Sequence, residues 1–230
     1  MAIDIERIVR TYKNKVRRND LIKSLAENAA DFRDAARYAA GTADELTAAI
    51  TAAGDIAALP ESELTELLDA GLRANHADVV RICRKVQRKI NDRARLGIGA
   101  LTPEYDSQTA VHAAQALAES AVTDDALLAQ LKKAVLGVVD ESIKRNFEAA
   151  GEIGLNVKIT RTYDNIGLRS GTKHAEDCQW CLAREGTWDN VDEAEAAGAF
   201  ERHPGCGCVI TYEVGKTRTW SNAAGKWTDL

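Results

Sequence analysis

Residues 177–212 read DCQWCLAREGTWDNVDEAEAAGAFERHPGCGCVITY, and this stretch holds four of the five cysteines of the 230-residue chain. The cysteines stand in two short phrases, Cys178-x-x-Cys181 and a HPGCGC phrase that runs from His203 to Cys208. Two closely spaced sets of Cys and His ligands, brought together by the fold, are typical of a tetrahedral zinc site. The stretch therefore predicts a small unit near the C-terminus that a metal holds together.

Five side chains of the two phrases are candidate zinc ligands, one more than a tetrahedral site takes. They are Cys178, Cys181, His203, Cys206 and Cys208. The first two have the spacing of a zinc knuckle, so their sulfurs can reach one ion from a single turn. We expect Cys206 or His203 to be the group that is spared, and the sequence does not choose between them. The expected cofactor is a structural Zn²⁺, because a domain of about 75 residues gains several kcal/mol from a structural metal.

Other roles for the cysteines are also compatible with the sequence. Reduced, partly buried thiols could hold the turn shapes without a metal, and a disulfide could form later under oxidising conditions. A cysteine nucleophile with His203 as its base would need an orienting group and an oxyanion site, and no motif marks either one.

A zinc-dependent enzyme is the alternative function. His174-Ala-Glu176 resembles the His-x-Glu element of zinc deaminases, in which the His and two Cys hold zinc and the Glu moves protons. The second deaminase element is not matched, because one residue and not two separates Cys206 from Cys208, and proline does not directly precede the first. We therefore expect no enzymatic activity. The alternative is a hydrolase or deaminase that uses His174, Glu176 and the C-terminal cysteines.

The chain before Gly154 has the composition of a helical protein. It is rich in alanine, and its apolar residues recur at helical spacing. One such stripe consists of Val79, Ile82, Cys83, Val86 and Ile90. Pro60 and Thr123 stand where helices are expected to begin. Glycines at positions 41, 54, 97, 99 and 151 mark expected breaks. We predict five to seven helices, packed as a bundle or as extended helical hairpins.

After Gly154 the pattern changes to that of short strands. Residues 155–161 alternate with period two, and residues 208–214 predict a second strand. A third strand, 216–220, is expected to follow the second through a tight turn at Gly215. One short helix is expected at about residues 192–199. All four tryptophans lie in this part of the chain, as a small domain with a limited core requires.

The predicted fold class is therefore α+β. A mostly α-helical region, residues 1–154, precedes a small α+β C-terminal domain, residues 155–230. That domain contains a short antiparallel sheet and the Cys/His cluster.

The charge of the chain restricts its partners. The formal net charge is −5, so nothing global indicates a nucleic-acid-binding protein. Residues 155–230 carry nine Lys and Arg against eleven Asp and Glu, which argues against a zinc-ribbon adaptor that binds nucleic acid. The first eighteen residues are basic, with Arg7, Arg10, Lys13, Lys15, Arg17 and Arg18. This segment is a candidate for a weak contact with DNA or an acidic partner, and the alternative is a solvated helix face.

The cellular compartment follows from what the sequence lacks. No apolar run approaches eighteen residues, so we expect no membrane span. The first ten residues do not show the basic and then apolar pattern of a signal peptide. We therefore expect synthesis in a reducing cytosol, where clustered cysteines are more often metal-binding or catalytic than disulfide-bonded.

The order of motifs in the C-terminal part resembles that of a known protein family. The motifs are Cys178-Gln-Trp-Cys181 with Gly186-Thr187-Trp188, then Arg202-His203-Pro-Gly-Cys206-Gly-Cys208, a strand, and Lys216-Thr-Arg-Thr-Trp220 with Gly225-Lys226-Trp227. This order is similar to the C-terminal region of the MuF-like minor head proteins of tailed bacteriophages. The resemblance covers about residues 155–230, a third of the chain.

The resemblance implies a structural role. A protein of this family is a minor capsid, or head morphogenesis, component that acts inside the head or near the portal, in assembly or genome delivery. The implied partners are the portal protein, the major capsid protein and further copies of the chain. The implied location is the virion, after synthesis in the cytoplasm of the host bacterium. The family is not a recognised enzyme class, and this chain has no room for an additional catalytic domain.

Overall fold

The computed structural model describes residues 3–120, 122–164, 178–215, 218–221 and 226–229. These residues form an α+β protein that is mostly helical, as predicted. In chain order the elements are α1 (Ile5–Arg18), α2 (Asp20–Asn28), α3 (Phe32–Thr51), the 3₁₀ helix η1 (Ile56–Ala58), α4 (Glu61–Arg93), α5 (Gln108–Glu119), α6 (Asp124–Glu152), β1 (Val157–Tyr163), α7 (Gln179–Leu182), β2 (Gly186–Trp188), α8 (Val191–Ala196), β3 (Cys208–Val214), β4 (Arg218–Ser221) and β5 (Lys226–Asp229).

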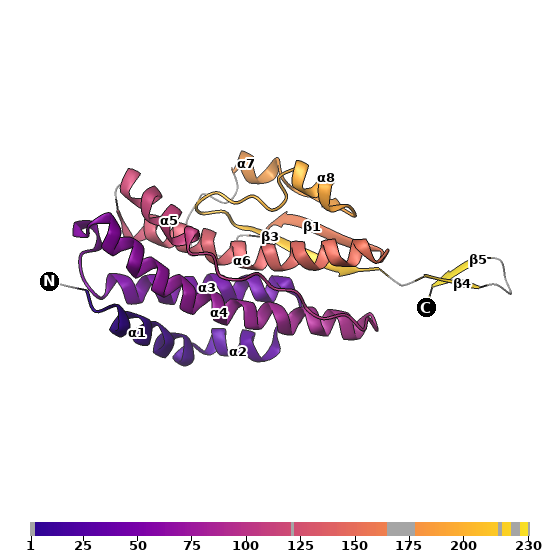
Figure 1. Cartoon of the computed structure of the whole chain (residues 1–230), viewed down its shortest axis with the longest axis horizontal. Coiled ribbons are helices and arrows are strands. Elements are labelled where there is room, and N and C mark those ends of the chain that lie inside the picture. Colours follow the sequence, from indigo (N-terminus) through magenta and orange to yellow (C-terminus); the bar gives the residue numbers. More distant parts are fainter. Residues whose placement is uncertain (1–2, 121, 165–177, 216–217, 222–225, 230) are drawn as a thin grey trace.

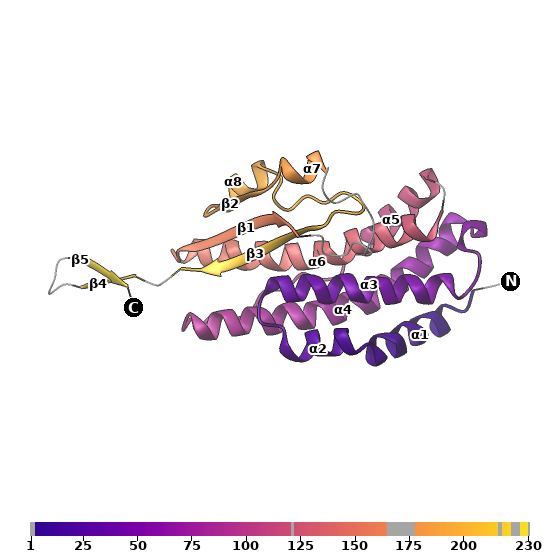
Figure 2. The same cartoon turned by 180° about the vertical axis from the view of Figure 1, so that it is seen from behind.

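The elements lie in layers. Figure 1 shows α1 and α2 on one side of α3 and α4, with α6 next, then β1 and β3, and finally α7 and α8. The view from behind in Figure 2 gives the same order. Packing contacts of α3 with α1, α4 and α6, and of α6 with β1, β3 and α8, connect these layers. The Cys/His phrases therefore lie on the sheet side of the molecule.

The helices begin where the sequence supplies capping side chains. Asp4, Asn19, Asp31 and Thr123 each accept a hydrogen bond from the backbone N–H three residues further on. Such caps satisfy donors that a helix leaves unpaired at its first turn. The stripe from Val79 to Ile90 is buried along α4, which confirms the predicted periodicity.

One predicted break is wrong. Gly41 lies within α3, where a Cβ would be 3.3 Å from Cγ1 of Ile22 on α2. Glycine at this position allows the two helices to pack closely, and it does not end the helix. The glycines at 54, 97 and 99 do lie between helices, and Gly151 lies in the last turn of α6.

The three-stranded antiparallel sheet has the order β2-β1-β3. The predicted strand at 208–214 is confirmed as β3, and the first predicted strand forms two residues later than expected, as β1. Ile159 on β1 is opposite Tyr212 on β3 and Trp188 on β2. The ring of Tyr212 packs edge-on against Phe32 of α3, with 6.3 Å between the ring centroids. This contact attaches the sheet to the helices.

The predicted third strand is present as β4, from Arg218 onward, whereas residues 216 and 217 lie outside the described residues. The expectation that a tight turn at Gly215 joins this strand to β3 is wrong. The Gly215 N–H donates to the carbonyl of Asn156 at 2.7 Å, so Gly215 extends the ladder between β3 and β1. A Cβ on Gly215 would lie 3.0 Å from that carbonyl oxygen, which favours glycine here. β4 instead pairs with β5 in a separate two-stranded sheet, drawn away from the other layers in Figures 1 and 2.

The helices and the three-stranded sheet share one hydrophobic core. Val157, Ile159 and Tyr212 of the sheet belong to the same buried cluster as Phe32 and Phe147 of the helices. The chain passes from helix to strand between Glu152 and Val157, where the sequence predicted a boundary. The division into two domains at this boundary stays a prediction.

Candidate metal centre

The first cysteine phrase forms a compact turn. Cys178 precedes the one-turn helix α7, and its sulfur accepts a hydrogen bond from the N–H of Cys181 at 3.4 Å. This arrangement directs the two sulfurs to the same side of the turn. Cys181 is fully buried, and Cys178 is partly exposed.

The second phrase forms a turn that ends at the start of β3. The N–H of Cys206 donates to the carbonyl of His203 at 3.1 Å. Gly205 closes the turn at a φ of +77°, a conformation that glycine adopts without steric cost. Cys208 is the first residue of β3 and is fully buried.

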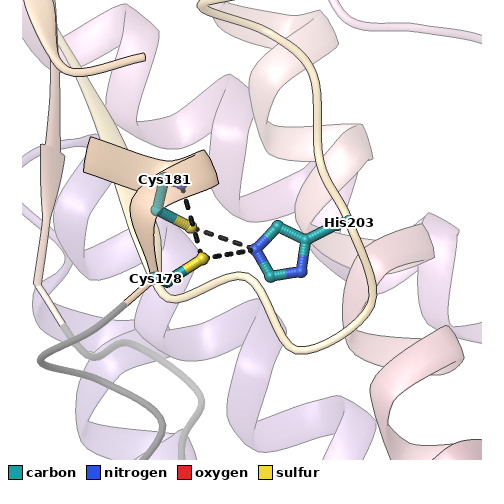
Figure 3. Close-up of side chains that lie close together, drawn as sticks. All are labelled: Cys178, Cys181 and His203. Carbon is teal, nitrogen blue, oxygen red and sulfur yellow. Dashed lines mark hydrogen bonds between the residues drawn. The ribbon is translucent and has the colours of Figure 1, made fainter. Parts of the chain in front are cut away.

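The structure brings all five predicted side chains together, in two groups that share Cys181. One group contains Cys178, Cys181 and His203, and the other contains Cys181, Cys206 and Cys208. Within each group the potential ligand atoms lie within 4.8 Å of one another. Figure 3 shows the first group, with both sulfurs directed at the imidazole.

The distances in the cluster are close to those of a tetrahedral zinc site. Zn–S bonds of about 2.3 Å and Zn–N bonds of about 2.0 Å place neighbouring ligand atoms about 3.5–3.8 Å apart. The sulfurs of Cys181 and Cys206 are 3.8 Å apart. Nε2 of His203 is 3.1 Å from the Cys181 sulfur and 3.3 Å from the Cys178 sulfur, slightly closer than a bound ion requires.

His203 has the hydrogen-bonding pattern of a metal ligand. Its Nδ1 is 2.7 Å from the carbonyl oxygen of Pro204, which can only accept, so Nδ1 carries the proton. The Nε2 lone pair then faces the sulfurs, as metal-binding histidines require. Trp180 packs edge-on against the imidazole, with 4.9 Å between centroids, and limits its rotation.

Two arginines surround the sulfur of Cys206. A guanidinium nitrogen of Arg161 and one of Arg202 each lie 3.7 Å from it. A hydrogen bond from Cys208 and the charges of these arginines lower the pKa of Cys206 to about 4, against the opposing effect of burial. Burial raises the pKa of Cys181 to about 12. The environment of Cys206 therefore favours its thiolate, whereas burial favours the neutral thiol of Cys181.

The same arginines attach the cluster to its surroundings. Arg161 is 1% exposed and donates to the carbonyls of Gly198, Ala199 and Glu201 at 3.0, 2.8 and 2.7 Å. Arg202 donates to the carbonyl of Cys208 at 2.9 Å and forms a bidentate ion pair with Asp140 of α6. Two guanidinium charges offset the negative charge that several thiolates would bring to a metal. The donor set and its neighbours therefore fit a bound metal ion.

Sequence reasoning missed Arg161, Arg202 and Asp140 as parts of the site. Arg161 takes the next inward-facing position of β1 after Val157 and Ile159. The period-two alternation of this strand could therefore have predicted that Arg161 is buried. Asp140 lies on the buried face of α6, where a carboxylate needs a partner. The ion pair itself joins residues 62 positions apart, and no local pattern predicts it.

The remaining candidates are placed as follows. His174 and Glu176, the residues of the enzyme alternative, lie outside the described residues. Cys83 is fully buried in α4, as its position in the apolar stripe predicted. The helical histidines are apart from the cluster: His76 is half-buried on α4, and His112 is exposed on α5.

Comparison with known proteins gives no relative for this chain, since it matches no family model, no curated protein and no solved structure. Within the described residues, no helix combines the length and the hydrophobicity that crossing a membrane requires.

Proposed function

We propose that the chain is a structural minor capsid, or head morphogenesis, protein of a tailed bacteriophage. It acts inside the head or near the portal, in assembly or genome delivery. The observation that carries the proposal is the order of the two cysteine phrases with the Gly186-Thr-Trp188 phrase between them. The meeting of both phrases in one cluster supports it, because the residues of the resemblance then form a single structural unit.

In this proposal the cluster binds a structural Zn²⁺. Four Cys or His ligands close the coordination sphere and leave no position for a substrate. The cluster lies against the sheet, whereas the cavity of about 370 Å³ lies between α4, α5 and α6 and is lined by no cluster residue. A closed cage apart from a cavity favours a structural role over the deaminase alternative.

The helical region provides the surfaces for partners in this proposal. Portal protein, major capsid protein or further copies of the chain would bind there. The basic residues of α1 are exposed, except for the half-buried Lys15, and remain candidates for a weak contact with DNA.

The test is the presence of the protein in particles. Antibody or mass-spectrometric detection in purified, DNA-filled heads, together with co-purification of the full chain with the portal protein, is the expected result. A portal or major capsid gene beside the encoding gene would agree with it. A neighbourhood of metabolic genes and absence from particles would refute the proposal. Loss of a deaminase activity in the Glu176→Ala variant would establish the enzyme alternative.

A further inference from the structure

The second half of α4 is strongly basic, and a further cation, Arg95, lies just beyond the helix. Between positions 81 and 95 the chain carries seven cationic residues and one acidic residue, Asp92. We call the seven the α4 cationic face: Arg81, Arg84, Lys85, Arg88, Lys89, Arg93 and Arg95. The whole chain is acidic, with a net charge of −5, so this stretch differs in charge from the chain as a whole.

Three of these cations are held in place by α2. Lys85 donates to the carbonyls of Ala26 and Glu27, Lys89 to that of Ala29, and Arg93 to that of Ala30. Ala26 and Glu27 lie in the last turn of α2, and Ala29 and Ala30 directly follow the helix. The helix dipole attracts cations at this end. α2 lies alongside α4 in both views of the molecule (Figures 1 and 2). The contacts fix three of the seven cations, of which Arg93 is exposed and Lys85 and Lys89 are half-buried.

The other cations are exposed and lie in a row. Arg81, Arg84 and Arg88 are exposed on successive turns of α4, and Arg95 is exposed just beyond its end. Arg84 is oriented by a hydrogen bond to the hydroxyl of Thr102 at 3.0 Å. From Arg81 to Arg93 the helix rises about 18 Å, a length along which duplex DNA presents about ten phosphates.

The basic residues of α1 have a different environment. Arg10, Lys13 and Arg17 line a groove between α1 and α4 that also contains Glu6, Glu66 and Asp69. Arg73, the fourth cation of this groove, is paired with Asp69 at 3.1 Å and stacks on Tyr105. Three carboxylates share the groove with the α1 cations, whereas on the α4 face Arg81 is the one cation that pairs with a carboxylate of the described residues, Asp78 at 3.8 Å. The α4 face is therefore the stronger site for a polyanion.

We propose that the α4 cationic face binds the phosphate backbone of nucleic acid without regard to base sequence. Five of its seven cations are arginines, whose planar guanidinium matches phosphate oxygens in a bidentate fork. No residue of α4 is among the exposed large hydrophobic side chains of the described chain, so the face lacks the anchors that a membrane surface requires. This inference goes beyond the proposed function and does not depend on it.

The test compares two triple variants of equal charge. Arg84→Gln, Arg88→Gln and Arg95→Gln together remove three exposed charges from the face. Arg10→Gln, Lys13→Gln and Arg17→Gln remove three from α1 as the matched control. Binding of the full chain to a fluorescent duplex of about 20 base pairs is measured by anisotropy between about 50 and 200 mM salt. Circular dichroism verifies that both variants are folded.

The α4 variant is expected to bind at least about ten-fold more weakly at the lowest salt, and its log–log salt slope should be about 2.7 shallower. When the salt concentration rises four-fold, the factor by which the affinity of the variant decreases should be about 40 times smaller than the factor for the parent protein. The α1 variant should stay within about three-fold of the parent at every salt concentration. An equal loss in both variants, or no binding by the parent at low salt, overturns the proposal. Equally tight binding of a polyglutamate of matched charge also overturns it, in favour of an acidic protein partner.

Discussion

A buried ion pair between Arg202 and Asp140 links the cysteine cluster to the helices. Both side chains are 4% exposed, and Nη2 of Arg202 is 2.8 Å from Oδ1 of Asp140. Arg202 directly precedes His203, and its guanidinium also contacts the Cys206 sulfur and the carbonyl of Cys208. Asp140 lies midway along α6. The pair therefore holds the second cysteine phrase against α6.

Asp140→Asn removes the charge at nearly constant volume and tests this link. It leaves the buried guanidinium without its carboxylate, and breaking a buried pair in this way costs about 3–5 kcal/mol. The carbonyl of the introduced amide can still accept one hydrogen bond, and the Cys206 thiolate remains 3.7 Å from Arg202. We therefore expect a loss near the lower end, about 3 kcal/mol, in the free energy of unfolding.

The assay is urea unfolding of the full chain, followed by tryptophan fluorescence and circular dichroism. In a protein of this size a loss of about 3 kcal/mol lowers the melting temperature by about 6–12 °C. The neighbouring Glu141→Gln variant is the matched control. Glu141 forms an exposed i,i+4 pair with Arg145 at 2.8 Å, and losing such a pair costs about 0.3–0.5 kcal/mol.

A cost for Asp140→Asn no larger than that for Glu141→Gln would refute the reasoning. The double variant Asp140→Leu with Arg202→Met gives a second test. Replacing both charges with apolar groups should recover part of the loss, since no unpaired charge stays buried. Recovery will be incomplete, because Arg202 also donates to the carbonyl of Cys208. A double variant less stable than Asp140→Asn by several kcal/mol would place the stabilisation in that second contact instead.

Three further predictions concern the metal, the thiolate and one glycine. Metal analysis of the purified protein should find about one zinc per chain. The Cys181→Ser variant should lose the zinc and several kcal/mol of stability in thermal melts, whereas the Cys83→Ser variant should keep the zinc. A parent protein that contains no zinc and is as stable as the Cys181→Ser variant would contradict this prediction. In metal-free protein the pKa of the Cys206 thiol is about 9 in the unfolded chain and about 4 in the folded one. The free energy of unfolding should therefore decrease as the pH is lowered from 9 to 4, and it should decrease less steeply in the Cys206→Ser variant. Parallel curves of urea midpoint against pH for the two proteins would refute this prediction. Gly137→Ala should stabilise the protein by about 0.5–1 kcal/mol in urea unfolding, because a Cβ there meets no atom within 4 Å in the middle of α6; a destabilised variant would show that the site needs glycine.

The sequence predicted elements whose determinants are local. β3 was found at its observed limits because five of the six residues after Cys208 are β-branched or aromatic. The roles of Gly41 and Gly215 were misjudged for a shared reason. Each glycine permits a close approach by a distant segment, Ile22 of α2 in one case and Asn156 beside β1 in the other. Sequence pattern gives the presence of such a glycine, whereas only the packed structure distinguishes a contact from a turn.

In the candidate site, too, features with local determinants were predictable and features that depend on distant contacts were not. The five potential ligands were predictable because each phrase places its ligands within a few residues, and a turn suffices to gather them. The charged neighbours were not predicted, because Asp140 and Arg202 meet only when α6 packs beneath the sheet. Asp140 nevertheless leaves a trace in the sequence, as a carboxylate between Leu136 and Ile143 on an apolar helix face. A lone charge on such a face indicates a buried partner even when the partner cannot be named.

The arrangement of these charges indicates that the cluster connects β1, the second cysteine phrase and α6. Arg161 extends from the central strand to the carbonyls that follow α8, and Arg202 extends from the second cysteine phrase to α6. Both arginines contact the sulfur of Cys206, so the strand, the loop and the helix meet at one ligand. Loss of a metal would leave the Cys206 sulfur between two guanidiniums, and these contacts would persist. We therefore expect metal removal to loosen α7 and the Cys178 turn first, while the attachment of β1 and β3 to α6 survives. Hydrogen exchange in the metal-free protein should show early exposure of residues 178–185 and continued protection of β1, and simultaneous loss of protection in both would refute this order.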